Sequence, residues 1–169
     1  MEEITMNNKI GFTGSRKLTG QKWQFAHNFA SQFQLDSVNV GCAKGLDTAI
    51  RTACPLAIVH EVQFPITKHA FINRSKKMTH DIEFLFAFPD TNCPAGIFPD
   101  EKWKSGNPTS GSWSTSAYAA YRNVTLYVYM PLFTQAIECL PQWPGSWQAS
   151  KWFKGFFQFT ATSYQQSIC

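Results

Sequence analysis

Short apolar runs alternate with segments of helical spacing along the first 130 residues. Consecutive apolar residues, as in Ile82 to Phe88 (IEFLFAF), are typical of strands that are buried on both faces of a sheet. Between such runs, apolar residues recur every three or four positions, as at Trp23, Ala26, Ala30 and Phe33. This spacing predicts amphipathic helices. The pattern therefore predicts an α/β fold built from repeated strand–helix units.

Five strands and four helices follow from this pattern. The expected strands are Lys9 to Thr13, Ser37 to Val40, Leu56 to Val62, Ile82 to Phe88 and Val124 to Met130. The expected helices are Thr19 to Leu35, Leu46 to Ala53, Thr67 to His80 and Gly111 to Tyr121. Regular alternation predicts a doubly wound parallel sheet of about five strands with helices on both faces. The loop from Pro89 to Ser112 is long for a compact domain, which suggests function or mobility.

The C-terminal part of the chain departs from the alternation. The segment LPQWPGSWQ predicts a turn-rich linker, and KWFKGFFQFTATSY predicts one extended segment or a hairpin. Its Trp and Phe side chains need burial, either on the core or against a second subunit. We therefore divide the chain into a domain at residues 1–131 and an aromatic C-terminal extension at residues 132–169.

Three polar, glycine-bearing turns follow predicted strands, at residues 14–16, 41–45 and 110–115. Ligands of parallel α/β sheets bind at the carboxyl ends of the strands, and helix starts attract anions. Glycine permits a tight turn and a close approach of the backbone. Four hydroxyl side chains within 110–115 favour an anion site over ordinary capping. The candidate binding residues are Gly14, Ser15, Arg16, Lys17, Gly41, Ala43, Lys44, Gly45, Asp47, Arg74, Ser110, Gly111, Ser112, Trp113, Ser114 and Thr115.

Several of these residues have two interpretations. Arg16 offers a fork of donors suited to phosphate oxygens, or belongs to a solvated turn. Asp47 accepts hydrogen bonds from a ribose or a base edge, or caps the second helix. Arg74 contacts the ligand or forms a surface salt bridge. Trp113 stacks on a base or belongs to the core, and Trp103 in the long loop is a candidate lid over a bound base.

Composition narrows the class of protein. Aromatic residues make up 15% of the chain and charged residues 15%, with a formal net charge of +4. An anionic partner is compatible with this charge but is not required by it. The acidic, polar N-terminus does not predict a secretory signal, and no apolar stretch is long enough to span a membrane. Five cysteines at wide spacing, without a CxxC motif, favour a reducing cytoplasm over a disulfide framework or a metal site.

Three segments resemble the DNA-processing protein DprA. VGCAKGLDTAI resembles its SGxAxGIDxxA segment, TSGSWSTSAYAAYRNVTLYVYMP resembles RSGSxxTAxxAxxxxRxVxxVPG, and FINRSKKMTHDIEFLFAF resembles FPRRNRxxxxLSDxxxxxxA. With the opening GSR, the resemblance covers roughly residues 9–131. The wider group that it resembles is the SLOG superfamily. The resemblance implies a Rossmann-like domain that binds nucleotides or nucleic acid.

The chain also departs from both branches of that superfamily. Thr109 stands where DprA has the arginine of RSGS, and Ser75 replaces an asparagine, although Arg74 is kept. The LOG phosphoribohydrolases carry a PGGxGTxxE segment. Aligning that segment with residues 111–115 places its catalytic glutamate at Tyr118, which favours a protein without that hydrolytic activity.

The sequence therefore predicts a protein that binds a small nucleotide-derived ligand, such as a cyclic nucleotide or an ADP-ribose-type signal. It would act as a sensor or sequester the ligand, without chemistry, cofactor or metal. One alternative is DprA-like binding of single-stranded DNA. A second alternative is a nucleotide N-glycosidic hydrolase, for which Asp47, Asp81 and Glu83 are the local carboxylates. We expect a cytoplasmic protein that contacts no membrane and forms a homodimer or a higher homo-oligomer.

Overall fold

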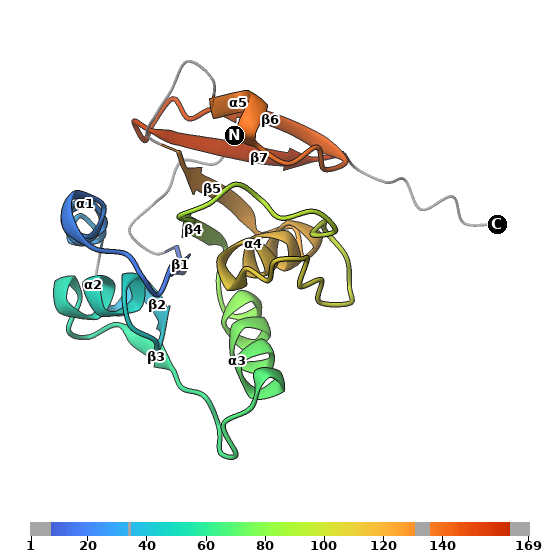
Figure 1. Cartoon of the computed structure of the whole chain (residues 1–169). Helices are drawn as coiled ribbons and strands as arrows, with labels where there is room; N and C mark the ends of the chain where they lie inside the picture. Colours follow the sequence, from blue (N-terminus) through green and yellow to red (C-terminus); the bar gives the residue numbers. More distant parts are fainter. Residues whose placement is uncertain (1–7, 34, 131–135, 163–169) are drawn as a thin grey trace.

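A sheet of seven strands organises the chain (Figure 1). The structure is a computed structural model, and it describes residues 8–33, 35–130 and 136–162. In chain order the elements are β1 (Ile10–Gly14), α1 (Gly20–Ala30), the 3₁₀ helix η1 (Leu35–Ser37), β2 (Val38–Gly41), α2 (Leu46–Ala53), β3 (Ile58–His60), α3 (Lys68–His80), β4 (Phe84–Phe88), α4 (Gly111–Tyr121), β5 (Thr125–Tyr129), α5 (Ala136–Cys139), β6 (Gly145–Ala149) and β7 (Phe156–Ala161).

The first five strands form the parallel sheet that the sequence predicts. Their order is β3-β2-β1-β4-β5, and β1 lies at the centre because Ile10 is in register with both Val38 and Phe84. Each crossover between neighbouring parallel strands contains a helix, as such connections require. The predicted α/β fold is confirmed.

The C-terminal hairpin adds two strands to this sheet, so the prediction of about five strands is too low. β7 pairs antiparallel with β5, and β6 pairs antiparallel with β7. β6 lies in the segment that the sequence analysis treats as a linker. Its side chains are largely exposed, so it lacks the apolar alternation that identifies a strand. Residues 132–135 and 163–169 of the predicted extension lie outside the described part of the chain.

Two separate hydrophobic clusters cover the two faces of the sheet. On one face, Phe12 and Phe86 stack with ring centroids 5.6 Å apart, and α1 and α2 pack over them. On the other face, Leu85 and Leu126 pack beneath α3 and α4 with the fully buried Trp113. Figure 1 shows these two pairs of helices on opposite sides of the strands. The predicted placement of helices on both faces is therefore confirmed.

The largest differences in length from the predicted elements are in α1 and β3. α1 ends at Ala30 rather than Leu35, because the backbone N–H groups of Gln32 and Phe33 donate to the carbonyls three residues earlier, at Phe29 and Ala30, and tighten the last turn. The strand predicted at Leu56 to Val62 is reduced to Ile58–His60, at the sheet edge, where Ile58 and Val59 are exposed. Among the described residues, no helix combines the length and apolar character needed to cross a membrane.

Candidate functional site

A cavity of about 760 Å³ lies at the carboxyl ends of the parallel strands. Its walls come from the turns after β1 and β2, from α3, from the loop at residues 89–110 and from the start of α4. Cavities that hold small ligands have volumes of roughly 300–1,000 Å³. The position is the one at which open parallel sheets bind their ligands.

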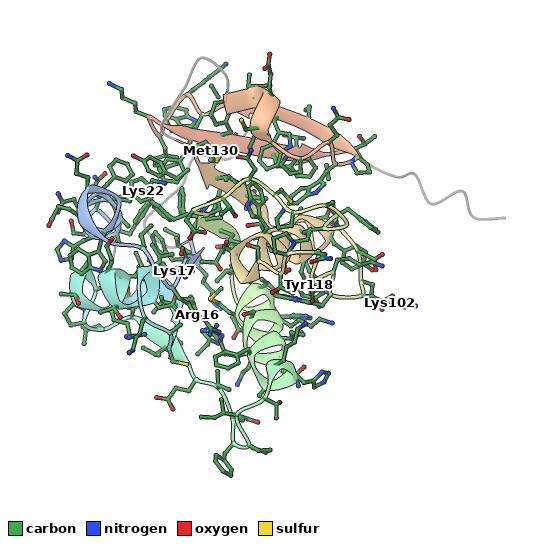
Figure 2. The ribbon with its side chains drawn as sticks, in the orientation of Figure 1. Arg16, Lys17, Lys22, Lys102, Tyr118 and Met130 are labelled. Carbon is green, nitrogen blue, oxygen red and sulfur yellow. The ribbon has the colours of Figure 1, made fainter. Side chains whose placement is uncertain are left out.

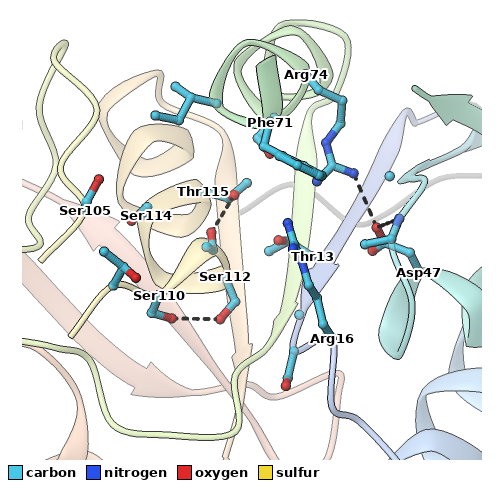
Figure 3. Close-up of a pocket in the computed structure, with 18 of the residues that line it drawn as sticks. Thr13, Arg16, Asp47, Phe71, Arg74, Ser105, Ser110, Ser112, Ser114 and Thr115 are labelled. Atoms are coloured by element: carbon cyan, nitrogen blue, oxygen red, sulfur yellow. Dashed lines mark hydrogen bonds and ion pairs between the residues drawn. The ribbon is translucent and has the colours of Figure 1, made fainter. Parts of the chain in front are cut away.

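Most of the predicted site residues line this cavity (Figure 3). Those that do so are Gly14, Ser15, Arg16, Lys17, Gly41, Ala43, Asp47, Arg74, Ser110, Gly111, Ser112, Ser114 and Thr115. The exceptions are Lys44, Gly45 and Trp113. The three turns that are far apart in sequence thus meet at one edge of the sheet.

A partly buried ion pair joins α3 to the second turn. Arg74 Nη1 lies 3.3 Å from Asp47 Oδ2, and the two side chains are only 11% and 9% exposed. The Ala43 backbone N–H donates to the same Asp47 oxygen at 3.0 Å. Burial raises the pKa of Asp47, and Arg74 and the Ala43 amide oppose that rise. Asp47 therefore shapes the turn and partly neutralises Arg74.

Gly41 allows this ion pair to form. A Cβ atom at position 41 would overlap the Arg74 guanidinium and lie 2.5 Å from Asp47 Oδ2.

Arg51, which the sequence analysis did not single out, also stabilises the turn at residues 41–45. It donates to the carbonyls of Gly41 and Ala43 at 2.9 and 3.1 Å. These contacts bridge eight to ten positions between a turn and a helix, and no local motif signals them.

Gly45 explains how the first and second turns fit together. Its φ is +71°, and a Cβ atom there would overlap the carbonyl oxygen of Ser15. The backbone N–H of Leu46 donates to that same oxygen at 3.1 Å. Gly45 therefore brings the two turns into backbone contact instead of lining the cavity, and the exposed Lys44 does not line the cavity either.

The ring of Phe71 contacts two arginine side chains on one side of the cavity. The guanidinium carbons of Arg16 and Arg74 lie 4.5 and 6.0 Å from the centroid of its ring. Such cation–π contacts orient a guanidinium group while leaving its donors available. We call these three residues the arginine wall. Phe71 was not predicted, although its spacing from Arg74 and Met78 on α3 marks one helical face, and all three line the cavity.

The polar segment 110–115, which we call the serine turn, forms the opposite side of the cavity (Figure 3). Ser110 is the N-cap of α4, and its Oγ accepts from the Trp113 backbone N–H at 3.5 Å and lies 3.2 Å from Ser112 Oγ. Thr115 Oγ1 donates to the Gly111 carbonyl at 2.7 Å. Ser114 is the hydroxyl of this turn that has no hydrogen-bond partner among the described residues. Most of the hydroxyls therefore stabilise the helix itself.

Trp113 and Trp103 have different environments. Trp113 is fully buried, and its Nε1 donates to the Thr91 carbonyl at 2.8 Å, so the structure places it in the core instead of against a ligand. Trp103 lines the cavity from the long loop, with its ring centroid 5.9 Å from that of Tyr118. Tyr118 itself does not line the cavity, and its hydroxyl lies 3.0 Å from His80 Nε2.

Asp90 is a cavity residue that the sequence analysis missed. It follows β4, is exposed, and accepts a hydrogen bond from Ser15 Oγ at 2.8 Å. Of the three carboxylates predicted for hydrolysis, Asp47 lines this cavity, whereas Asp81 and Glu83 do not. Within the described ranges, no three His, Cys, Asp or Glu side chains lie close enough together to hold a metal ion.

A doubly wound α/β domain with its cavity at the carboxyl edge is the class of protein that these features define. The sequence matches no protein-family model, and no curated protein matches it significantly. Among solved structures, the fold is similar to DNA processing protein A from Helicobacter pylori, a protein described as binding single-stranded DNA in a unique mode. The TM-score is 0.53 at 13% identity, over 76% of this chain and 68% of that chain. The likeness in fold agrees with the DprA resemblance read from the sequence, and membership of the SLOG superfamily stays a prediction.

Proposed function

We propose that the cavity binds single-stranded DNA, with a backbone phosphate against the arginine wall. The proposal rests on one observation: the guanidinium groups of Arg16 and Arg74 both lie over the Phe71 ring, at the carboxyl edge of a parallel sheet. Arginine forks suit phosphate oxygens, and an aromatic ring beside a positive groove suits an unpaired nucleic-acid strand. The proposal is the alternative that the sequence analysis left open, and the single-stranded DNA binding described for the structural neighbour supports it.

The charges on the cavity walls are consistent with a bound anion. Asp47 offsets the charge of Arg74, which leaves Arg16, Lys17 and Lys68 as the further cations on the walls. Arg74 Nε is buried and has no hydrogen-bond partner among the described residues. A buried donor without a partner costs about 1–3 kcal/mol, so a ligand oxygen that reached it would stabilise the site.

A small nucleotide-derived ligand is the second candidate, and the volume of the cavity favours it. About 760 Å³ is enough to enclose one nucleotide or a compact dinucleotide. In that case the protein would sense or sequester the ligand, as the sequence analysis predicts. Both candidates place a phosphate at the arginine wall, and they differ in whether the ligand continues out of the cavity.

Fluorescence anisotropy with a labelled single-stranded oligonucleotide tests the proposal. We expect Arg16→Met to weaken binding about tenfold, because it removes one charged phosphate contact. We also expect the slope of log affinity against log salt to become less steep by about 0.7. Lys22→Met is the matched control, since Lys22 is an exposed cation on α1, apart from Arg16 and outside the cavity (Figure 2).

Two further measurements separate the two candidates. Competition by unlabelled mononucleotides and cyclic dinucleotides, together with mass spectrometry of molecules released on heating the purified protein, identifies a small ligand. Tight binding of a small nucleotide without measurable oligonucleotide binding would reject the DNA proposal. Equal losses of affinity in Arg16→Met and Lys22→Met would reject the arginine wall as the binding surface.

A further inference from the structure

Asp90 lies where the sheet changes its winding direction. β1 and β4 are neighbours in the sheet, while the chain leaves β1 towards β2 on one side and leaves β4 towards β5 on the other. Ser15 directly follows β1, and Asp90 comes two residues after β4 ends at Phe88. Both line the cavity, at the topological switch point where a ligand enters deepest between the strand ends.

The hydrogen bonds at this point have a defined direction. The backbone N–H of Lys17 donates to Ser15 Oγ at 3.0 Å, and Ser15 Oγ donates to Asp90 Oδ2 at 2.8 Å. The hydroxyl proton of Ser15 is therefore committed to the carboxylate and is not offered to a phosphate. Neither ion pair formed among the described residues involves Asp90. A carboxylate is an acceptor with four lone-pair sites, so Asp90 has unused acceptor capacity beside the cavity.

Groups of opposite charge therefore line the same cavity. The arginine wall attracts phosphate, whereas the carboxylate of Asp90 repels it and attracts hydrogen-bond donors. In a deoxynucleotide the groups that donate strongly are on the base, chiefly the exocyclic amino groups. The amino group of cytosine is a known type of partner for a carboxylate, and thymine has an acceptor, O4, at the same position.

We propose that Asp90 determines base preference, by accepting a hydrogen bond from an exocyclic amino group of the nucleotide bound in the cavity. This inference rests on the proposed function. It predicts that the site binds oligodeoxycytidine more tightly than oligodeoxythymidine of equal length, by about fivefold, a ratio expected for one good hydrogen bond to a base edge.

The test compares both oligonucleotides on three proteins by fluorescence anisotropy. In Asp90→Asn the carboxamide both donates and accepts, so the preference for cytosine should fall to twofold or less. Glu101→Gln is the matched control, because it removes one negative charge from an exposed residue of the same loop that does not line the cavity. The control should keep the full preference. A melting temperature of Asp90→Asn close to that of the wild type would show that its fold is intact.

Each outcome decides the proposal. Binding without a base preference in the wild-type protein, or a preference that survives in Asp90→Asn, would overturn the role of Asp90 while leaving DNA binding intact. A preference for oligouridylate over its deoxy counterpart that Asp90→Asn abolishes would assign a ribose hydroxyl to Asp90 and overturn the base assignment. If no oligonucleotide binds the wild-type protein, the proposed function fails, and this inference fails with it.

Discussion

The two sides of the cavity use their polar groups in opposite ways. On the arginine wall, Arg16 is exposed and rests on Phe71, and Arg74 bonds to Asp47 through one of its nitrogens. On the serine turn, Ser110 and Thr115 bond to the backbone of α4. In the sequence both sides resemble anion sites. The turns at residues 14–16, 41–45 and 110–115 each combine glycine and polar residues with the start of a helix.

From the difference between the two sides we expect donors near a helix start to bind a ligand only if the helix does not use them itself. Side chains of Ser and Thr are short and reach their own backbone, which is why these residues favour N-caps. Guanidinium groups are carried on longer side chains and reach across to other elements. Substitutions on the arginine wall should therefore change ligand binding, whereas substitutions on the serine turn should mainly change stability.

The largest expected effect is that of Arg74→Met, which leaves Asp47 buried without its partner. We expect the free energy of unfolding at neutral pH to fall by about 3 kcal/mol, as measured by urea denaturation. Burial already raises the pKa of Asp47, and loss of Arg74 removes an opposing influence. The folded state then takes up a proton at a higher pH than the unfolded state, so the deficit should shrink as the pH falls towards 3.8.

Lys76→Met is the control for this substitution. Lys76 lies on the same helix, and its Nζ is 5.0 Å from the Tyr118 ring centroid, a contact worth about 0.5–1 kcal/mol. A loss in Arg74→Met no greater than that in Lys76→Met, or a deficit that does not depend on pH, would contradict the buried ion pair.

A smaller effect should come from adding one methyl group at Gly41. Gly41→Ala should displace the Arg74 guanidinium, lower stability by about 1–2 kcal/mol, and weaken oligonucleotide binding as strongly as loss of Arg74 does. Gly111→Ala makes the same change on the serine turn, where a Cβ atom would meet nothing within 4 Å. Its stability should stay constant or rise by up to about 1 kcal/mol, with unchanged affinity. Similar losses of affinity in both variants would remove the distinction between the two sides.

The smallest effects should come from the serine turn itself. Ser110→Ala removes the N-cap of α4 and should cost about 1 kcal/mol of stability, with affinity for the oligonucleotide within twofold of the wild type. Ser114→Ala should leave stability unchanged and reduce affinity by about threefold at most, since this hydroxyl faces the cavity without a partner. Thermal unfolding and anisotropy measured on the same preparations check both values. A tenfold loss of affinity in Ser110→Ala would show that the serine turn binds the ligand directly.

Local patterns were sufficient to predict the parallel part of the fold. α2 and α4 begin and end at the predicted residues, with Gly45 and Ser110 as their N-caps. The hairpin was recognised only in part. β6 has a glycine at φ +153° and mostly exposed side chains, so it becomes a strand only by pairing with β7.

Part of the site is predictable from the rule that ligands of parallel sheets bind at the carboxyl ends of the strands. That rule brought together the three turns, and applied to β4 it would also have found Asp90. It could not show that Gly45 supports a turn instead of contacting a ligand, since that depends on how closely Ser15 approaches in space. The same holds for Arg51, whose two contacts with the turn are to backbone carbonyl groups and carry no side-chain signature.

The indole nitrogen of Trp143 has a consequence for how this cavity could be transferred between proteins. It donates at 2.9 Å to the carbonyl of Ile97, in the middle of the loop that carries Trp103, and its ring packs edge-on against Trp113. A fusion that borrowed only residues 1–131 would carry the strands and turns of the cavity, and would keep the hydrogen bond from Trp113 to Thr91, but it would lose the one from Trp143. For gene fusion, and for exchange of this module between proteins during evolution, we therefore expect the portable unit to include Trp143 and the hairpin that follows it.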